Sequence, residues 1–256
     1  MAGELAAEVF RHSYPDDFWQ PRTRKAYLEY LKDIYPNCDF ESNWPDFEDL
    51  ITVLDEWEDY HCSYEGTGTS GNLLNVAHLK NVLLKHLGLL LCERTAAASS
   101  SGQMDVIKDF VRSVCEEKST IISFNWDLLV EIAAKELNIG ISYGSETNDG
   151  LEIAKPHGSL NLAELETERF TEMQDSINIH SLQIDWKTDS TVVIRTSDPI
   201  DAANRIIHPF ESALLVEPTA RKSYLSGWIQ LQWRRALDFL RQVEELVVIG
   251  YSLPNT

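Results

Sequence analysis

Two short apolar runs rich in β-branched residues, each followed directly by polar residues, constrain the fold of this chain most strongly. The first, Thr120-Ile121-Ile122, leads into Ser123-Phe124-Asn125-Trp126-Asp127. The second, Leu246-Val247-Val248-Ile249, leads into Gly250-Tyr251-Ser252-Leu253-Pro254. Such runs are typical of strands buried inside a sheet. Helical patterns lie between the strands, and this alternation predicts a parallel, doubly wound sheet.

The helices around these strands are predicted from apolar residues spaced three and four apart. One helix is expected at 127–137 and another at 228–243, with one buried stripe formed by Ile229, Trp233, Ala236, Leu237 and Leu240. Further strands are expected at 177–184, 191–195 and 213–216.

The stretch from residue 24 to residue 118 is helical and poor in strands, with a low-complexity loop at 96–102. We therefore predict an α/β protein in which a Rossmann-like, doubly wound parallel sheet carries a large helical insertion. Residues 1–23 and 119–256 would form the Rossmann-like domain, and 24–118 the insertion.

Composition limits the classes of partner and the compartment. The formal net charge of −19 argues against direct binding to nucleic acid, which requires clustered Lys and Arg. Four scattered cysteines without a Cys-x-x-Cys pair provide neither a zinc ribbon nor a disulfide framework, which favours a reducing cytoplasm. The most apolar stretch, 82–92, is too short to span a bilayer, and no signal peptide is recognisable. We expect a soluble cytoplasmic protein without a membrane partner.

A third segment, Lys155-Pro156-His157-Gly158-Ser159-Leu160-Asn161, lies between the two strand ends in the sequence. Because ligands bind outside the carboxyl ends of parallel strands, we expect Asn125, Asp127 and His157 to meet the Gly250–Ser252 turn there. Together they would form one site with an amide, a carboxylate and an imidazole.

Each of these residues also has a purely structural interpretation. Asp127 stands where a helix begins and could be its N-cap, either instead of contacting a ligand or in addition to it. His157 could be an ordinary loop histidine, and Gly250 could only end a strand. Lys155 is interpreted as a solvated charge rather than a phosphate ligand. No metal site is predicted, because the chain has no His-x-x-x-His and only one Glu-x-x-His, from Glu58 to His61.

The three segments, in this order, resemble the sirtuin superfamily. Within it they resemble the sirtuin-like NAD hydrolases of bacterial anti-phage defence more than the protein deacylases. The resemblance implies NAD as substrate, with Asn125 and His157 as the catalytic pair. The residues that it implies for NAD binding are Ser123, Phe124, Asp127, Gly158, Gly250 and Ser252.

These residue types suit the cleavage of NAD between nicotinamide and ribose. The reaction develops oxocarbenium-like positive charge on the ribose and requires polar groups that hold the sugar, together with a base. The amide of Asn125 both donates and accepts hydrogen bonds. An unperturbed histidine has a pKa of about 6.5, which suits His157 to act as a general base.

The chain departs from the family in two ways. Family members open with a strand and a Gly-Ala-Gly-x-Ser turn that holds the pyrophosphate, and this chain has no such turn. We interpret it as truncated at both ends, or alternatively as having lost the turn, and expect it to bind NAD poorly as written. The zinc ribbon of the deacylating sirtuins is also missing.

The leading hypothesis is therefore an NAD hydrolase (NADase) domain that depletes NAD during phage infection, although this truncated chain could itself be inactive. One alternative is a non-catalytic sensor or scaffold that binds NAD or ADP-ribose, and a further alternative is an NAD-dependent protein deacylase. A fused or separate sensor or effector protein, and a homo-oligomer, stay open as partners.

Overall fold

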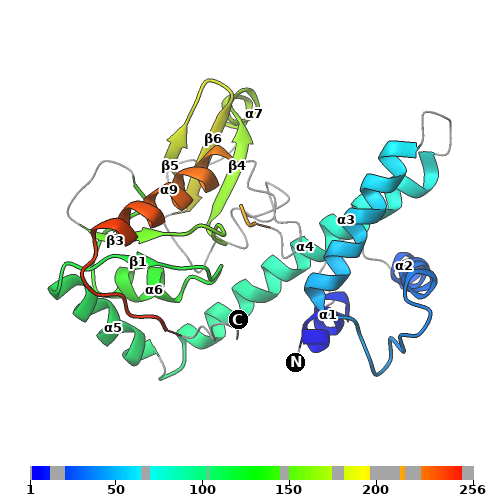
Figure 1. Ribbon diagram of the computed structural model, residues 1–256, viewed down its shortest axis with the longest axis horizontal. Helices are drawn as coiled ribbons and strands as arrows, with labels where there is room; N and C mark the ends of the chain where they lie inside the picture. The colour runs from blue at the N-terminus through cyan, green and yellow to red at the C-terminus, as the bar shows by residue number, and fades with distance from the viewer. Residues whose placement is uncertain are drawn as a thin grey trace.

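The structure is a computed structural model, which describes residues 2–11, 21–64, 70–102, 104–144, 150–174, 182–196, 214–216 and 226–249. Within these residues the chain is mixed α/β. Figure 1 shows a helical block at one end of the molecule and the sheets at the other, joined by the long helix α4.

The helical block consists of α1 (Ala2–Arg11), α2 (Pro21–Ile34), α3 (Phe47–Tyr64) and the first part of α4 (Ser70–Ser99). Its core is apolar, and Leu31, Leu50 and Leu79 are fully buried there. Helix α1, which we assigned to the Rossmann-like domain, packs in this core against α3 and α4.

Helix α4 belongs to both cores of the molecule. Leu83 and Leu87 lie in the core of the helical block, whereas Leu89 and Cys92 lie in the core around the parallel sheet. The loop predicted at 96–102 is wrong over its first half, because α4 continues through Ser99. Alanine has the highest helix propensity, and the hydroxyls of the serines at 99–101 bind carbonyls of the last turn, which satisfies groups left open at a helix end.

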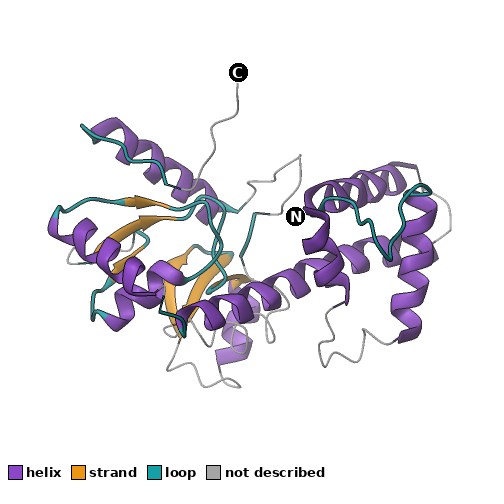
Figure 2. Ribbon diagram, turned by 90° about the horizontal axis from the view of Figure 1, so that it is seen from below, coloured by secondary structure: helices purple, strands orange, loops and turns teal. Residues whose placement is uncertain are grey.

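A three-stranded parallel sheet forms the centre of the α/β part. It consists of β1 (Ile121–Ile122), β2 (Ile141–Ser142) and β3 (Leu151–Ala154), in the order β1-β3-β2. Helix α6 (Leu129–Glu136) covers one face and packs against α5 (Met104–Glu116), while α9 (Gly227–Gln242) covers the other (Figures 1 and 2). The predicted parallel sheet is confirmed at this coarse level, although three strands do not define a doubly wound order.

A second sheet is antiparallel and was not predicted as such. Its strands are β4 (Leu162–Glu166), β5 (Leu182–Lys187) and β6 (Thr191–Thr196), in the order β4-β6-β5, and α7 (Thr167–Gln174) packs beside it. The strand predicted at 191–195 is confirmed, and the one predicted at 177–184 is described from Leu182 onwards. Instead of a strand at 213–216, the described residues there form a single bridge from Leu215 to Gly158.

Ser226 is the N-cap of helix α9, and its hydroxyl accepts a hydrogen bond from the main-chain N–H of Ile229. The fully buried residues of this helix are Trp228, Ile229, Gln232 and Ala236. The predicted stripe is therefore rotated, because Leu237 and Leu240 are exposed and the polar Gln232 is buried.

The final strand predicted at Leu246–Ile249 is wrong. The chain from Val243 to Ile249 is described as an irregular segment, and the side chains of Leu246, Val247, Val248 and Ile249 are 56–71% exposed. A strand requires a hydrogen-bonded neighbour, and no described strand pairs with this segment.

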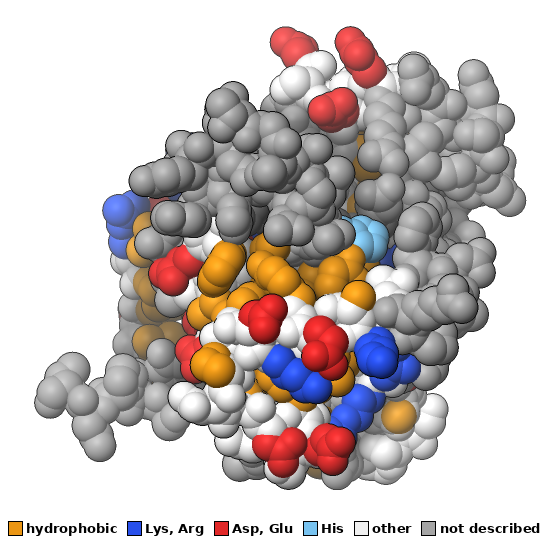
Figure 3. Space-filling model, turned by 90° about the vertical axis from the view of Figure 1, so that its right-hand side faces the viewer, with side chains coloured by type: hydrophobic (Ala, Val, Ile, Leu, Met, Phe, Trp, Pro, Cys, Tyr) orange, Lys and Arg blue, Asp and Glu red, His pale blue; other side chains and the backbone are white. Residues whose placement is uncertain are grey.

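On the face shown in Figure 3, acidic side chains lie beside Lys and Arg, and the described residues form no continuous basic surface there. None of the helices that the structure describes combines the length and apolar character needed to cross a membrane.

Candidate functional site

Two of the three segments singled out in the sequence lie together at one edge of the parallel sheet. Residues 123–128 follow β1 and residues 155–161 follow β3, and these strands pair in parallel with Ile122 beside Ala154. The main-chain N–H of Ser123 donates to the carbonyl of Ala154 at 2.9 Å. The indole N–H of Trp126 donates to the carbonyl of His157, also at 2.9 Å. These two loops therefore lie side by side, whereas the third segment, from Gly250 onwards, lies outside the described residues.

Three aromatic rings from three elements meet at this edge. The rings of Phe124 and His157 lie edge to face with 5.1 Å between their centroids. Trp233 of α9 completes the group, at 5.7 Å from Phe124 and 6.0 Å from His157. Phe124 nevertheless keeps 47% of its surface exposed, so the group opens to solvent rather than forming a closed core.

The two predicted catalytic residues are both accessible. Asn125 is exposed in the loop after β1, and His157 is partly exposed in the loop after β3. Ser123 is partly exposed as well. The loops that carry the amide and the imidazole thus lie at the same sheet edge, and neither side chain is buried. Gly250 and Ser252 lie outside the described residues.

Asp127 is not the N-cap that was considered for it, because Leu128 occupies that position and α6 begins at Leu129. Its carboxylate oxygen Oδ1 accepts a hydrogen bond from the main-chain N–H of Leu129 at 3.1 Å, at the start of α6. A carboxylate in this position satisfies an open N–H group of the helix. The side chain is partly exposed, and the proposed contact with the ribose stays a prediction.

Gly158 supports the site by its backbone. Its φ angle of 85° lies in the left-handed region that favours glycine. A Cβ atom at this position would collide with the carbonyl of Leu214. The close approach arises because residues 157–159 pair with 214–216. In this pairing Ser159 N–H donates to Leu214 O, and Val216 N–H donates to His157 O.

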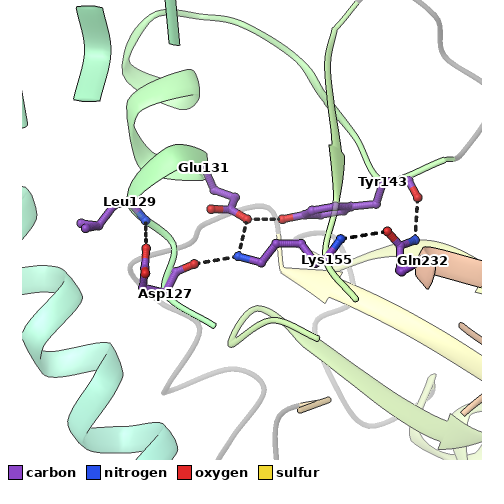
Figure 4. A network of polar contacts seen from close by, with 6 residues as sticks. All are labelled: Asp127, Leu129, Glu131, Tyr143, Lys155 and Gln232. Atoms are coloured by element: carbon purple, nitrogen blue, oxygen red, sulfur yellow. Dashed lines mark hydrogen bonds and ion pairs between the residues drawn. The ribbon is translucent and has the colours of Figure 1, made fainter. Parts of the chain in front are cut away.

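Lys155 is fully buried, so the prediction of a solvated charge is wrong. Its ammonium Nζ donates to the main-chain carbonyl of Asp127 at 2.8 Å and forms an ion pair with Glu131 Oε1 at 3.1 Å (Figure 4). The phenol of Tyr143 donates to the same Glu131 oxygen at 2.7 Å. Burial raises the pKa of Tyr143 well above its ordinary value of 10.0, and the Glu131 carboxylate raises it further, so the phenol stays protonated as the donor.

Sequence reasoning missed Glu131, Tyr143 and Gln232, all of which are buried in the same network. One signal was present: Lys155 directly follows the apolar end of β3, at the strand end where polar groups gather. The other three come from a helix, a strand end and a second helix. Their meeting depends on tertiary packing that one sequence does not reveal.

No group of three or more His, Cys, Asp or Glu side chains arranged to hold a metal occurs among the described residues. No protein-family model matches the chain, and no curated protein sequence matches it either.

Proposed function

We propose that this chain is a sirtuin-like NAD hydrolase domain, which releases nicotinamide from NAD at the edge formed by the loops after β1 and β3. The observation that supports this best is that the loops carrying Asn125 and His157, from remote parts of the sequence, meet at one sheet edge. Neither side chain is buried there, and the His157 ring lies beside Phe124 and Trp233. A role in anti-phage defence by NAD depletion is proposed from the resemblance alone.

The side chains present fit the chemistry of this reaction. The faces and edges of Phe124 and Trp233 suit stacking against a planar ring such as nicotinamide, and they exclude water from one side of the ribose. The Asn125 amide would hold a ribose hydroxyl or the attacking water. His157 would take the proton of that water as its oxygen bonds to the ribose carbon, while the electron pair of the broken carbon–nitrogen bond passes to nicotinamide.

We also propose that the parallel sheet is part of a Rossmann-like arrangement. Three parallel strands between two helical layers, with the candidate site at their carboxyl ends, support this assignment. The dinucleotide would then lie across the ends of β1 and β3, with its nicotinamide end beside His157.

The test is release of nicotinamide from NAD by the purified chain, measured by chromatography at high NAD concentration, because weak binding is expected without the glycine turn. We expect release by the native chain and a fall of about 100- to 10,000-fold in His157→Ala, the range found when a general base is lost. His78→Ala is the matched control, because His78 is also partly exposed but lies on α4 in the helical block. Asn125→Ala should lose activity as well, with the exposed Asn43→Ala as its control.

Release that is undiminished in His157→Ala would refute the proposed mechanism. Calorimetry with ADP-ribose separates the first alternative: binding without nicotinamide release would indicate a sensor or scaffold module. Mass spectrometry of acylated peptides incubated with NAD tests the second alternative, a protein deacylase.

A further inference from the structure

One buried polar network connects the loop after β1 and the carboxyl ends of β2 and β3 with α9 (Figure 4). The Lys155 ammonium holds the carbonyl of Asp127 in the loop after β1. The Lys155 main-chain N–H, at the end of β3, donates to Gln232 Oε1 at 3.1 Å. Gln232 Nε2 in turn donates to the carbonyl of Tyr143, just past β2, at 2.8 Å. Two side chains thus connect the loop after β1 and the ends of β2 and β3 with α9.

The members of this network are neighbours in sequence of the rings at the candidate site. Gln232 precedes Trp233, Lys155 lies two residues before His157, and Asp127 ends the segment that contains Phe124 and Asn125. Any shift of the ammonium or of the Gln232 amide would therefore move one site loop relative to the others. The Trp126–His157 hydrogen bond connects the same two loops directly.

The burial of this charge pair argues for a role in placement rather than in stability. The side chains of Lys155 and Glu131 are each only 2% exposed. Removing two charges from water is costly, and a buried pair replaced by apolar residues often leaves stability unchanged or improved. What an apolar pair could not supply is the directed hydrogen bond to the Asp127 carbonyl, which sets where the loop after β1 lies.

We propose that Lys155 is a positioning residue, which acts through the Asp127 carbonyl and the Glu131 carboxylate to hold the Asn125 loop against the His157 loop. The expected effect of Lys155 on turnover rests on the proposed function. The expected effect of Lys155 on the position of His157 does not. Lys155 itself is buried and touches no substrate.

The test compares the neutral double variant Lys155→Met/Glu131→Gln with the native chain. The double variant leaves no unpaired buried charge, and the new amide keeps an oxygen for Tyr143. The matched control is Lys80→Met/Asp55→Asn, which removes a partly buried ion pair of 2.6 Å between α4 and α3, far from the site in sequence. Turnover, thermal melting and the NMR signals of the His157 imidazole, assigned with His157→Ala, are measured for all three proteins.

We expect kcat of the double variant to fall about 10- to 100-fold with KM changed less than threefold, as a small misplacement of catalytic groups produces. The His157 signals should shift, whereas the control variant should keep native kcat and native His157 signals. An unchanged kcat together with unchanged His157 signals would overturn the proposal. Rescue of kcat by Lys155→Arg, which keeps the donor to the Asp127 carbonyl, would support it further.

The outcomes also separate this inference from the proposed function. If the native chain releases no nicotinamide but the His157 signals still shift in the double variant, the NAD hydrolase proposal fails and the positioning role stands. If the double variant does not fold, Lys155→Gln/Glu131→Gln is measured instead, since it also leaves no buried charge and its shorter side chain at 155 withdraws the donor from the Asp127 carbonyl. A shifted His157 signal in this variant supports the proposal, and an unshifted one overturns it.

Discussion

Gly158 shows how a single residue can be needed at this site for its backbone alone. The sequence suggested it as a contact for NAD, and that role stays a prediction. The structure adds that it must adopt a positive φ while the chain at 214–216 approaches closely. A side chain is excluded on both grounds.

We therefore expect Gly158→Ala to lower the free energy of unfolding by about 1–3 kcal/mol or more, because the new Cβ is strained and meets the Leu214 carbonyl. Denaturant unfolding measures the change. Gly102→Ala is the control: no atom lies within 4 Å of a Cβ there, so its effect should be near zero or slightly stabilising. Equal effects of the two substitutions would contradict the described pairing of residues 157–159.

Asp185 on β5 is a buried carboxyl group that makes the stability of the protein depend on pH. Its side chain is only 3% exposed, and it pairs with Arg195 at 3.3 Å. Burial raises the pKa of Asp185 from 3.8 to about 6, against the opposing effect of Arg195. Because the folded-state pKa lies above the unfolded one, the folded protein takes up a proton as the pH falls through 6, while the unfolded chain stays ionised down to about pH 4.

This carboxyl therefore adds stability as the pH falls, by about 1 kcal/mol between pH 7 and pH 5. Denaturant unfolding at both pH values should show this gain in the native chain and its loss in Asp185→Asn. The exposed Asp189→Asn should keep the native pH dependence. The same pH dependence in Asp185→Asn and the native chain would show that Asp185 is not the group responsible.

At the scale of secondary-structure elements, the sequence predicted those helices and strands that are determined by the local pattern of apolar residues. The strand at 121–122, the helices at 129–136 and 227–242, and the strand at 191–196 were all expected close to their observed places. The meeting of the 123–128 and 155–161 loops also followed, since strand ends of a parallel sheet share one edge.

The elements that were missed depend on neighbours. The apolar run Leu246–Ile249 has strand composition, but no described strand pairs with it. Lys155 has no local sign of burial, because its partners Glu131 and Gln232 come from two different helices. The buried face of α9 includes Gln232, because this residue hydrogen-bonds within the network. The apolar periodicity alone does not predict this face.

Residues 96–99 offer a direct test at this scale, because a loop was expected and the structure has the end of α4. Ala97 is exposed, so its helix propensity can be measured without a packing effect. We expect Ala97→Gly to lower the free energy of unfolding by about 1 kcal/mol, whereas in a loop the change would be close to zero. Denaturant unfolding distinguishes the two.

At the scale of the whole molecule, helix α4 connects the two hydrophobic cores. It contributes apolar side chains to the core of the helical block and to the core around the parallel sheet. A helix of this length, 30 residues, spans about 45 Å at 1.5 Å per residue. The candidate site lies entirely on the α/β part, at the edge where β1 and β3 end, and the described helical block contributes none of its ring or network residues.

The central claim is that the loops after β1 and β3 form one binding site. The most direct measurement is an NMR titration with ADP-ribose that follows the side-chain amide of Asn125 and the imidazole of His157 in the same sample. Both signals should shift with one dissociation constant, while the control residues Asn43 and His78 should not respond. A response of only one of the two residues, or two different dissociation constants, would contradict the central claim.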